Sequence, residues 1–327
     1  MSFFLGIDTS NYTTSVSAFD SETNKVYLSR KLLPVKEGSL GLRQSDAVFH
    51  HTSRVFEIFS SLYDQVKIPR DEIALISSSI SPRRREGSYM PCFLVGKAVG
   101  DVLSLALDAP KEYFSHQEGH IASALFKASE DGGFYFCKDR LRLLESELIA
   151  FHFSGGTSDC LLVRNKKGEA MEISEICSSL DLKAGQAVDR VGAMLGLGFP
   201  AGKELEALAR LSDKSYCPKP YSKNGSVSFS GLENKCQKML SDGESKPNIA
   251  RFALDYIASS AQIMLDFARK SYGDLPVILS GGVMSNQLIK NKLFSDNKNI
   301  IACETALSSD NSCGVALLGY LKSKGFV

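Results

Sequence analysis

Three segments of the sequence follow one plan, in which an apolar run predicted to be a β-strand passes into a turn of small and hydroxyl residues. Such residues after a strand let the backbone come close to a bound anion, with N–H groups turned toward it. One such turn is weak evidence, because many strands end in glycine and serine, whereas three together are a more specific sign of anion binding. The segments are Phe3–Ser10, Leu148–Ser158 and Pro276–Gly282.

The regions between these segments are mostly helical by the spacing of their apolar residues. Strand hairpins alternating with helices predict an α/β fold with mixed sheets. The helical signal of Asp189–Leu211 is interrupted at Gly196–Pro200, and Tyr216–Ser230, rich in Ser, Pro, Lys and Gly, is predicted to be a loop. The other predicted helices are Gln44–Val66, Phe93–Ala106, Gln117–Ala128, Ile249–Ser271 and Asn311–Ser323.

Composition restricts the class of protein. A chain of 327 residues with 43% hydrophobic and 23% charged residues is typical of a globular protein with two domains or one large bilobal unit. The net charge of +1 gives no global attraction to nucleic acid, so any polyanion site must be a local patch. No apolar run approaches the roughly 18 residues that a membrane helix needs. The eight cysteines include no C-x-x-C pair, which is typical of reduced thiols and predicts a cytoplasmic protein without membrane contact.

Two histidines, His116 and His120, stand four residues apart. On a helix this spacing places both imidazoles on one face, where they can reach one metal ion. Glu118 lies two residues from each histidine, about 200° around the helix, so zinc-peptidase chemistry lacks its general base. The simpler alternative is a pair of surface histidines. Asp310 could supply a third ligand, and its simpler alternative is a helix N-cap.

Six ordered motifs between Phe4 and Tyr320 resemble those of a known family. The matches are His116–His120 with H-x-E-G-H, Phe153–Cys160 with a strand and S-G-G-H-T, Ala184–Leu208 with G-E-x-x-D-K…LGL-x-YPGG-x-x-[DE], Ser228–Leu232 with S-F-S-G-L, Ser280–Asn286 with GGV-x-x-N, and Ser309–Asn311 with T-D-N. The family that they resemble is TsaD, also called the glycoprotease or tRNA threonylcarbamoyladenosine synthase family.

The resemblance implies an actin-like (ASKHA) α/β fold, with two lobes of mixed sheets and helices around a cleft. We expect an N-terminal lobe of residues 1–112, completed by a C-terminal helix at about 308–327, and a C-terminal lobe of residues 113–307 with the nucleotide and metal motifs. The implied reaction moves a threonylcarbamoyl group from threonylcarbamoyl-AMP to N6 of the adenosine beside the tRNA anticodon. The implied partners are tRNA, a TsaB-like protein on the N-terminal lobe and a TsaE-like ATPase.

The resemblance also assigns site residues. One divalent metal ion, iron or zinc, falls on His116, His120 and Asp310. The carboxylates of Asp189 and Glu206 suit ribose hydroxyls, and Gly202 lets the sugar approach. The simpler alternatives are solvated charges on a helix and a glycine in a turn. By the resemblance, the turn after Phe153 binds the anionic part of the acyl-adenylate, and the later motifs bind the nucleoside. The substrate-binding residues so assigned are Phe153, Ser154, Gly155, Gly156, Thr157, Asp189, Gly202, Glu206 and Asn286.

The sequence departs from the family pattern at three places. The family begins G-I-E-T-S-C-D-E-T, and here Tyr12-Thr13 replaces the acidic pair, which leaves Asp8 as the catalytic carboxylate candidate. Thr157 replaces the histidine of S-G-G-H. The segment Ser81–Gly87 replaces a glycine-rich turn, and its run Arg83–Arg85 either binds phosphates or a substrate carboxylate or is a solvated basic loop. These departures indicate a divergent paralogue.

Four functions compete. We expect a metal-dependent threonylcarbamoyl transferase. The alternative is a non-catalytic nucleotide-binding paralogue that regulates or scaffolds a true TsaD; the loss at Tyr12-Thr13 favours it, and the retained His116, His120 and Asp310 oppose it. A peptidase is disfavoured by the position of Glu118, and a sugar kinase by the metal-binding pair.

Overall fold

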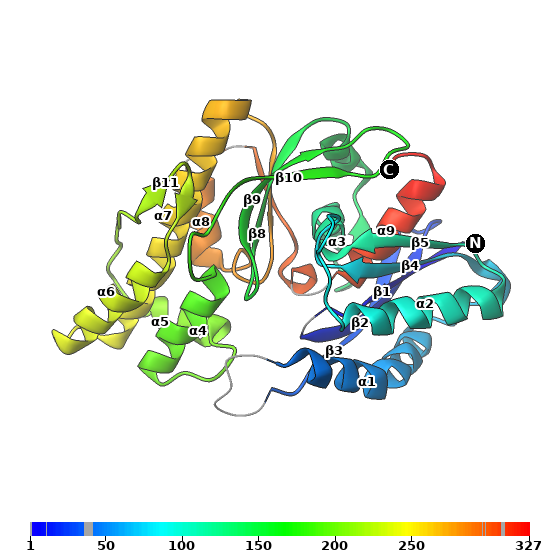
Figure 1. Ribbon diagram of the computed structural model, residues 1–327, viewed down its shortest axis with the longest axis horizontal. Helices are drawn as coiled ribbons and strands as arrows, with labels where there is room; N and C mark the ends of the chain where they lie inside the picture. Colours follow the sequence, from blue (N-terminus) through cyan, green and yellow to red (C-terminus); the bar gives the residue numbers. More distant parts are fainter. Residues whose placement is uncertain (1, 11, 36–41, 296, 298, 309–310) are drawn as a thin grey trace. The chain divides into compact units, whose positions relative to one another are not determined.

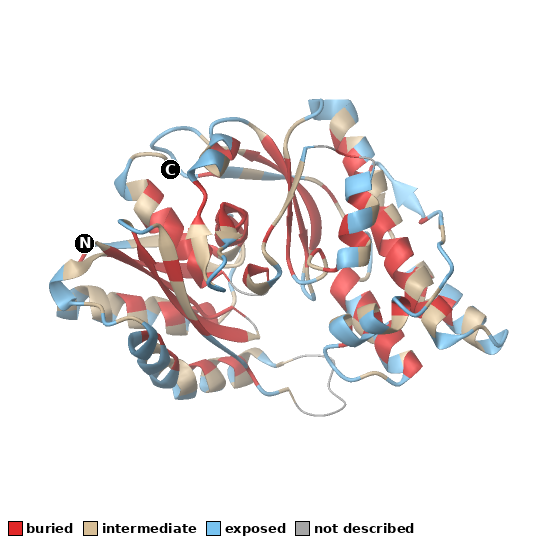
Figure 2. Cartoon of the chain, turned by 180° about the vertical axis from the view of Figure 1, so that it is seen from behind, coloured by how far each residue is buried: buried red, intermediate tan, exposed pale blue. Residues whose placement is uncertain are grey.

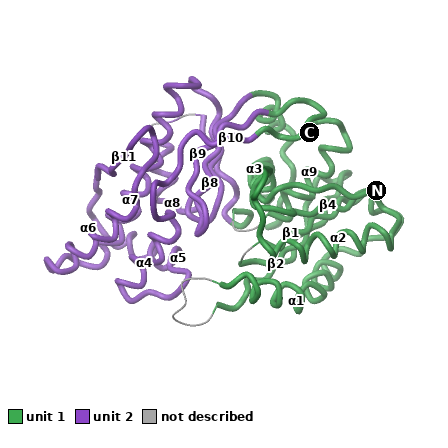
Figure 3. The backbone as a smooth tube through the Cα atoms, viewed as in Figure 1, with its two compact units in different colours: residues 1–146, 165–172, 306–327 green, residues 147–164, 173–305 purple. Residues whose placement is uncertain are grey.

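The computed structural model describes residues 2–10, 12–35, 42–295, 297, 299–308 and 311–327. Its mixed sheets and helices confirm the predicted α/β class. The chain divides into two compact units (Figures 1 and 3): unit 1 contains Met1–Ser146, Asn165–Glu172 and Ala306–Val327, and unit 2 contains Glu147–Arg164 and Ile173–Thr305. The lobe boundary expected after residue 112 stays a prediction. In the division observed, the first unit continues to Ser146, so both histidines of the candidate metal pair belong to it.

Unit 1 is built on a mixed sheet with the strand order β5-β4-β1-β2-β3-β7-β6. β1 pairs antiparallel with β2, so that Phe4 lies opposite Phe19, and it pairs parallel with β4. Every residue of β1 and β2 is buried, because helices cover both faces of the sheet (Figure 2). The strands are β1 (Phe3–Asp8), β2 (Thr13–Asp20), β3 (Lys25–Leu32), β4 (Ile73–Ser81), β5 (Lys111–Ser115), β6 (Phe126–Ala128) and β7 (Phe134–Phe136).

The two faces of this sheet follow from the alternation of side chains along β1. Ile7 packs in one core cluster with Ile58 of α1, whereas the ring of Phe4 lies 5.3 Å from that of Tyr320 in α9. Helices α1 and α2 therefore cover one face and α9 covers the other. The helices of unit 1 are α1 (Gln44–Gln65), α2 (Phe93–Leu107), α3 (His116–Ser123) and α9 (Ser312–Ser323), with 3-10 turns at Arg70–Glu72 and Lys138–Leu144.

The predicted helix Gln117–Ala128 is wrong in its second half. Helix α3 ends at Ser123, and Phe126–Ala128 instead forms β6, paired antiparallel with β7. Phe19 explains the change, because its ring contacts the rings of Phe126 and Phe136 at 6.2 and 6.1 Å. Packing against this ring overrides the local helical pattern.

Unit 2 contains a five-stranded sheet with the order β10-β9-β8-β13-β14. β8 pairs antiparallel with β9 and parallel with β13. The strands are β8 (Leu148–Phe153), β9 (Ser158–Arg164), β10 (Glu172–Ser178), β13 (Val277–Ser280) and β14 (Ile300–Ala302); the helices are α4 (Ala184–Leu195), α5 (Gly202–Ala209), α6 (Ser230–Ser241), α7 (Lys246–Tyr272) and α8 (Gln287–Ser295). A 3-10 turn, Thr305–Leu307, spans the boundary with unit 1.

Most predicted helices of the chain are confirmed within two or three residues. The predicted interruption at Gly196–Pro200 separates α4 from α5, and Gly196 takes a left-handed conformation with φ 83°. The predicted loop Tyr216–Ser230 also holds a small hairpin of β11 (Ser222–Lys223) and β12 (Ser226–Val227). Among the described residues, no helix is long and apolar enough to cross a membrane.

Candidate functional site

The carboxylate of Asp8 lies at the end of β1 and faces the first residue of α3. Its oxygens lie 3.2 Å from Nδ1 of His116, and the hydroxyl of Ser10 donates to Oδ2 at 2.9 Å. The hydroxyl of Ser79 on β4 donates to Oδ1. Thr13, in place of a family acid, is buried in β2. The structure thus brings two of the predicted site residues, Asp8 and His116, into direct contact.

Asp8 is held in its charged form. Burial alone would raise its pKa, because a fully buried carboxylate loses its hydration. The charge and hydrogen bond of His116, with the hydroxyls of Ser79 and Ser10, outweigh burial and lower the pKa of Asp8 below its usual value. A carboxylate on the ring of a metal-binding histidine is the usual arrangement that fixes the orientation of such a ring.

His116 and His120 lie one turn apart on α3, with ring centroids 4.7 Å apart and an interplanar angle of 75°. The side chain of His116 is 17% exposed and His120 is 3% exposed, so they are not a pair of surface histidines. Imidazole nitrogens are ligands that both iron and zinc accept, so this pair fits the expected metal. Among the described residues no group of three or more His, Cys, Asp or Glu side chains is placed to hold a metal ion. Asp310 lies outside the described residues.

Asn311 is a site residue that the sequence reasoning did not assign, although it belongs to the T-D-N match. Its amide nitrogen donates to the backbone oxygen of His116 at 3.0 Å and lies 2.9 Å from Nδ1 of the same residue. Gly119 permits this approach, because a Cβ there would lie 2.9 Å from Cβ of Asn311. The glycine of H-x-E-G-H therefore serves the packing of α9 against the histidine helix.

Glu118 has a structural role. Its carboxylate accepts a hydrogen bond from the backbone N–H of Ser115 at 2.6 Å, and the Ser115 hydroxyl accepts from the N–H of Glu118 at 3.2 Å, which closes a capping box at the start of α3. Arg84 donates to the same carboxylate at 3.1 Å and to the backbone oxygen of Tyr113. One arginine of the Arg83–Arg85 run is thus tied to α3.

The turn after β8 is a closed loop held by Ser154. The hydroxyl of Ser154 accepts from the N–H of Gly156 at 3.3 Å and of Thr157 at 3.2 Å, and it contacts the Thr157 hydroxyl at 2.8 Å. Phe153 precedes the turn with its ring buried against Phe229. Thr157, which replaces the family histidine, is therefore part of the turn itself.

This turn packs on the N-terminus of α4. The N–H of Gly185 donates to the oxygen of Ser154 at 3.1 Å, and a Cβ on Gly185 would lie 2.6 Å from the nitrogen of Gly155. On Gly155 and Gly156, by contrast, an added Cβ would meet nothing within 4 Å, and both are exposed. The turn thus offers open glycine backbone beside the positive end of a helix dipole, which suits an anion.

The third glycine turn, Ser280–Gly282, lies against the second. Gly281 has φ 91°, and a Cβ there would lie 2.3 Å from the oxygen of Phe153. The parallel pairing of β13 with β8 produces this contact, because it sets Ser280 opposite His152 at the same edge of the sheet. Two of the three predicted turns are therefore neighbours in unit 2.

Asp189 of α4 contacts the residue that precedes Gly202, at the start of α5. Oδ1 of Asp189 accepts from the N–H of Ala201 at 2.9 Å, so the carboxylate holds the loop that starts α5. Burial raises the pKa of Asp189, and this hydrogen bond opposes the shift. The nearest atom to a Cβ on Gly202 would be 4.0 Å away, which leaves that glycine open to a ligand.

Glu206 and Asn286 meet at the first turn of α8. Oε1 of Glu206 accepts from the N–H of Gln287 at 3.2 Å and from Arg210 at 2.6 Å. Oδ1 of Asn286 accepts from the N–H groups of Leu288 and Ile289, at 3.0 and 3.1 Å, as a helix cap. Hydrogen bonds thus join α4 to the start of α5, and α5 to the start of α8. The four predicted nucleoside residues lie on or beside these three helices.

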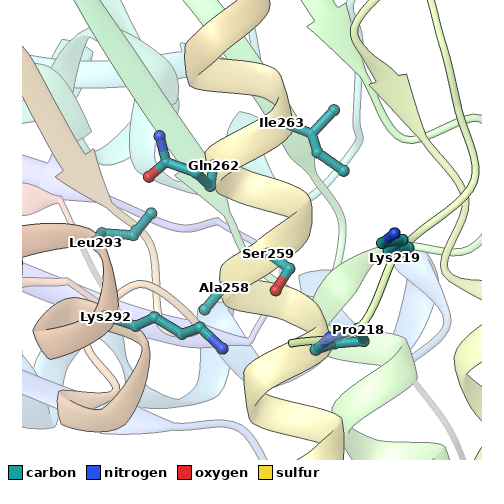
Figure 4. A pocket seen from close by; sticks show the side chains of 8 residues that line it. All are labelled: Pro218, Lys219, Ala258, Ser259, Gln262, Ile263, Lys292 and Leu293. Carbon is teal, nitrogen blue, oxygen red and sulfur yellow. The ribbon is translucent and has the colours of Figure 1, made fainter. Parts of the chain in front are cut away.

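A pocket of about 260 Å³ opens elsewhere in unit 2, beside α7 and α8 (Figure 4). None of the predicted site residues lines it. Two of its polar groups already have protein partners: Gln262 donates to Asp266, and Lys292 to the backbone oxygen of Tyr216. We do not assign it as the active site. Its lining residues are Pro218, Lys219, Ala258, Ser259, Gln262, Ile263, Lys292 and Leu293.

Known proteins resemble the chain over nearly its whole length. The model of the family described as TsaD, tRNA N6-adenosine threonylcarbamoyltransferase, matches residues 36–317. Proteins of that name from Thermosipho melanesiensis and Thermosipho africanus are 28% and 29% identical to it. These matches cover 97% and 98% of this chain and 93% and 94% of the relatives.

Solved structures at lower identity share the fold. HypF of T. kodakarensis is 14% identical with a TM-score of 0.62, over 99% of this chain and 48% of that chain. A ROK family glucokinase from Streptomyces griseus is 11% identical with a TM-score of 0.53, over 99% of this chain and 100% of that chain. These similarities concern the fold alone, and they confirm the predicted actin-like class.

Proposed function

Since the chain belongs to the TsaD family of tRNA N6-adenosine threonylcarbamoyltransferases, we propose that it transfers a threonylcarbamoyl group from threonylcarbamoyl-AMP to N6 of the adenosine adjacent to the tRNA anticodon. Family membership makes the chain an acyltransferase of tRNA modification. The observation that carries the finer proposal is the linked set in unit 2, an open glycine turn followed by Asp189, Glu206 and Asn286. An acyl-adenylate needs such a set, because it joins an anion to a nucleoside.

The turn at Ser154–Thr157 is the proposed site for the anionic part of the acyl-adenylate. Gly155 and Gly156 leave room for a phosphate or carboxylate to approach the backbone. Ser154 holds the turn in shape, and Thr157 closes it. Phe153 anchors it in the core. The proposed contribution is electrostatic, since the turn and the N-terminus of α4 are set before the ligand arrives.

The nucleoside is proposed to lie against α4, α5 and α8. Asp189 and Glu206 provide acceptors for ribose hydroxyls, and Gly202 lets the sugar approach. The oxygen of Asn286 caps α8, so its amide nitrogen is the group that would contact the ligand. Each side chain is already fixed by a backbone hydrogen bond, which lowers the entropy cost of binding.

His116, His120 and Asp310 are proposed to hold one divalent metal ion, iron or zinc. When bound, such an ion supplies positive charge that neutralises a phosphate and polarises a carbonyl. Asp8 is the proposed catalytic carboxylate, and its burial and three partners suit it to orient His116. Attack by a neutral exocyclic amine needs positioning and removal of a proton, with no covalent enzyme intermediate.

Transfer also requires tRNA and, by family resemblance, a TsaB-like protein and a TsaE-like ATPase. Helix α1 exposes Phe49, Phe56 and Tyr63, spaced seven residues apart on one face, and α2 exposes Val102 and Leu105. Exposed apolar stripes of this kind usually mark a protein interface, so we propose this face for the TsaB-like partner. The setting we propose is the cytoplasm, where tRNA is available; the eight cysteines form no disulfide.

The test is a reconstituted reaction. Purified protein is incubated with unmodified tRNA, threonine, bicarbonate, ATP and an adenylate-forming enzyme, with and without the partner proteins, and adenosine is analysed by mass spectrometry. We expect threonylcarbamoyladenosine. No product in either condition, with intact binding of threonylcarbamoyl-AMP, would leave the alternative, a non-catalytic paralogue that regulates or scaffolds a true TsaD. The substitution of the acidic pair by Tyr12-Thr13 is the feature that favours that alternative.

A further inference from the structure

Lys290 is a lysine buried beside the proposed nucleoside site. It lies on α8 one turn after Asn286, and its N–H donates to the oxygen of Asn286 at 3.0 Å. Residues four apart share a face of a helix, so Lys290 lies below Asn286 on the same side. Only 7% of its surface is exposed, which is unusual for a lysine.

The ammonium group of Lys290 has no hydrogen-bond or ion-pair partner among the residues that the structure describes. Burial lowers its pKa, and the carboxylates of Glu304 and Glu206 oppose that shift. Most of the residue is covered, yet its ammonium forms no direct pair with a described residue, so packing alone does not account for a charge at this position. Of the two carboxylates that act on it, Glu206 belongs to the proposed site.

The two groups that donate hydrogen bonds to Glu206 give its carboxylate only a screened charge and a partial charge. Arg210 pairs with it as an i,i+4 neighbour on α5, but the arginine side chain is 52% exposed, so solvent screens the pair. The N–H of Gln287 supplies a partial charge at the start of α8. Because Lys290 is much less exposed than Arg210, solvent screens its charge less at equal distance.

We propose that Lys290 is a positioning residue of the nucleoside site, whose positive charge helps to hold the carboxylate of Glu206 in place at the first turn of α8. This inference rests on the proposed function, because it assigns Glu206 to the nucleoside. Lys290 acts through Glu206 and needs no contact with the ligand. The positive charge of Lys290, more than the length of its side chain, is the property that affects Glu206.

The variant that tests this is Lys290→Met, which keeps the length of the side chain and removes the charge. AMP is the probe, and its Kd is measured by calorimetry together with the thermal midpoint of each variant. We expect Lys290→Met to raise the Kd for AMP about tenfold without lowering the midpoint, because the substitution removes no ion pair among the described residues and keeps the apolar stem of the side chain. Lys290→Arg should keep the affinity within about threefold, because it keeps the charge.

A double-mutant cycle separates positioning from packing. If Lys290 acts through Glu206, then Lys290→Met combined with Glu206→Gln should bind AMP no more weakly than Glu206→Gln alone. Lys292→Met is the matched control, because this lysine lies on the same helix but pairs with Asp255; its AMP affinity should equal that of the wild type.

Two results overturn the inference while sparing the proposed function. One is unchanged AMP affinity in Lys290→Met when the wild type binds AMP. The other is a lower midpoint with additive effects in the cycle, which is the result of a structural role. Absence of AMP and threonylcarbamoyl-AMP binding by the wild type overturns the proposed function, and this inference with it.

Discussion

Gly119 of α3 and Gly314 of α9 meet backbone to backbone: a Cβ atom on Gly314 would lie 1.9 Å from the carbonyl oxygen of Gly119. No side chain fits at this crossing. The close approach sets Asn311, just before α9, against the ring and backbone of His116. The geometry of the histidine pair therefore depends on two residues that have no side chain.

The crossing of α3 and α9 should not tolerate a side chain. Gly314→Ala should lower the free energy of unfolding by about 3 kcal/mol, because both helices must move apart. Urea denaturation measures it. Gly282→Ala is the control, since a Cβ there meets nothing within 4 Å, and its stability should match the wild type. Equal stability of the two variants would contradict the packing described.

Substitutions at two glycines can separate ligand binding at the turn after β8 from the stability of that turn. Gly155→Ala should leave the unfolding free energy within about 0.5 kcal/mol of the wild type, because the Cβ has open space, yet it should weaken threonylcarbamoyl-AMP binding by obstructing the ligand. Gly185→Ala should instead destabilise the turn, since its Cβ would lie 2.6 Å from Gly155. Calorimetry and urea denaturation on both variants distinguish the two effects. Unchanged affinity in Gly155→Ala argues against ligand contact at the turn.

The metal assignment predicts a loss that elemental analysis can measure. His116→Ala should lose most of the iron or zinc that the wild type binds, because removal of one of the three proposed ligands usually abolishes tight binding. His50→Ala is the control, because this histidine lies on α1, outside the metal pair. Equal metal content in wild type and His116→Ala shows that the ligand assignment is wrong.

A pH dependence follows from His51, which is fully buried on α1. Its Nδ1 hydrogen-bonds with the Thr14 hydroxyl at 2.8 Å, and its Nε2 has no partner among the described residues. Burial lowers the pKa of His51 from 6.5 to about 4, although the charge of Asp8 opposes the shift. The unfolded chain therefore binds this proton more readily, so stability should fall as the pH drops from about 6.5 to 4, by about 3 kcal/mol in all.

Urea denaturation at several pH values measures this loss. His51→Gln should reduce the slope between pH 6.5 and 4, because it cannot be protonated there, while His50→Gln on the same helix should keep it. If the slope in His51→Gln equals that of the wild type, another group causes the acid sensitivity.

Asp181 is predicted to hold the start of α6. Its carboxylate accepts from the hydroxyls of Ser228 and Ser230, both at 2.6 Å, and from the N–H of Phe229 at 2.8 Å. Burial would raise its pKa, but these donors lower it to about 2, so the stabilisation is present above pH 3.8 and is lost as the pH falls toward 2.

Asp181→Asn should reduce the free energy of unfolding at pH 7 by about 1 kcal/mol, because the amide accepts fewer hydrogen bonds. Hydrogen exchange should increase at Phe229 and Ser230. Asp242→Asn, at the other end of α6, is the control and should leave exchange at these residues unchanged. Unaltered exchange in Asp181→Asn would show that the contacts do not hold this turn.

The sequence predicted the elements well where a local signal was strong. The helix predicted as Gln44–Val66 is Gln44–Gln65, and the break at Gly196–Pro200 falls between α4 and α5. It failed at Phe126–Ala128, where three rings from separate strands override a helical pattern. The H-x-E-G-H match located the histidine pair, but the pattern did not indicate that Glu118 would close a capping box and bind Arg84.

By itself the sequence determined the glycine turns, several strands, most of the long helices and the family, because periodicity, turn chemistry and motifs act over a few neighbouring residues. Only the tertiary structure decided which residues meet: Asn311 and His116 are 195 positions apart, and Glu206 and Gln287 are 81 apart. It also decided that Lys290 and His51 are buried. Such contacts depend on how whole helices pack against sheets, and no short stretch of sequence contains that information.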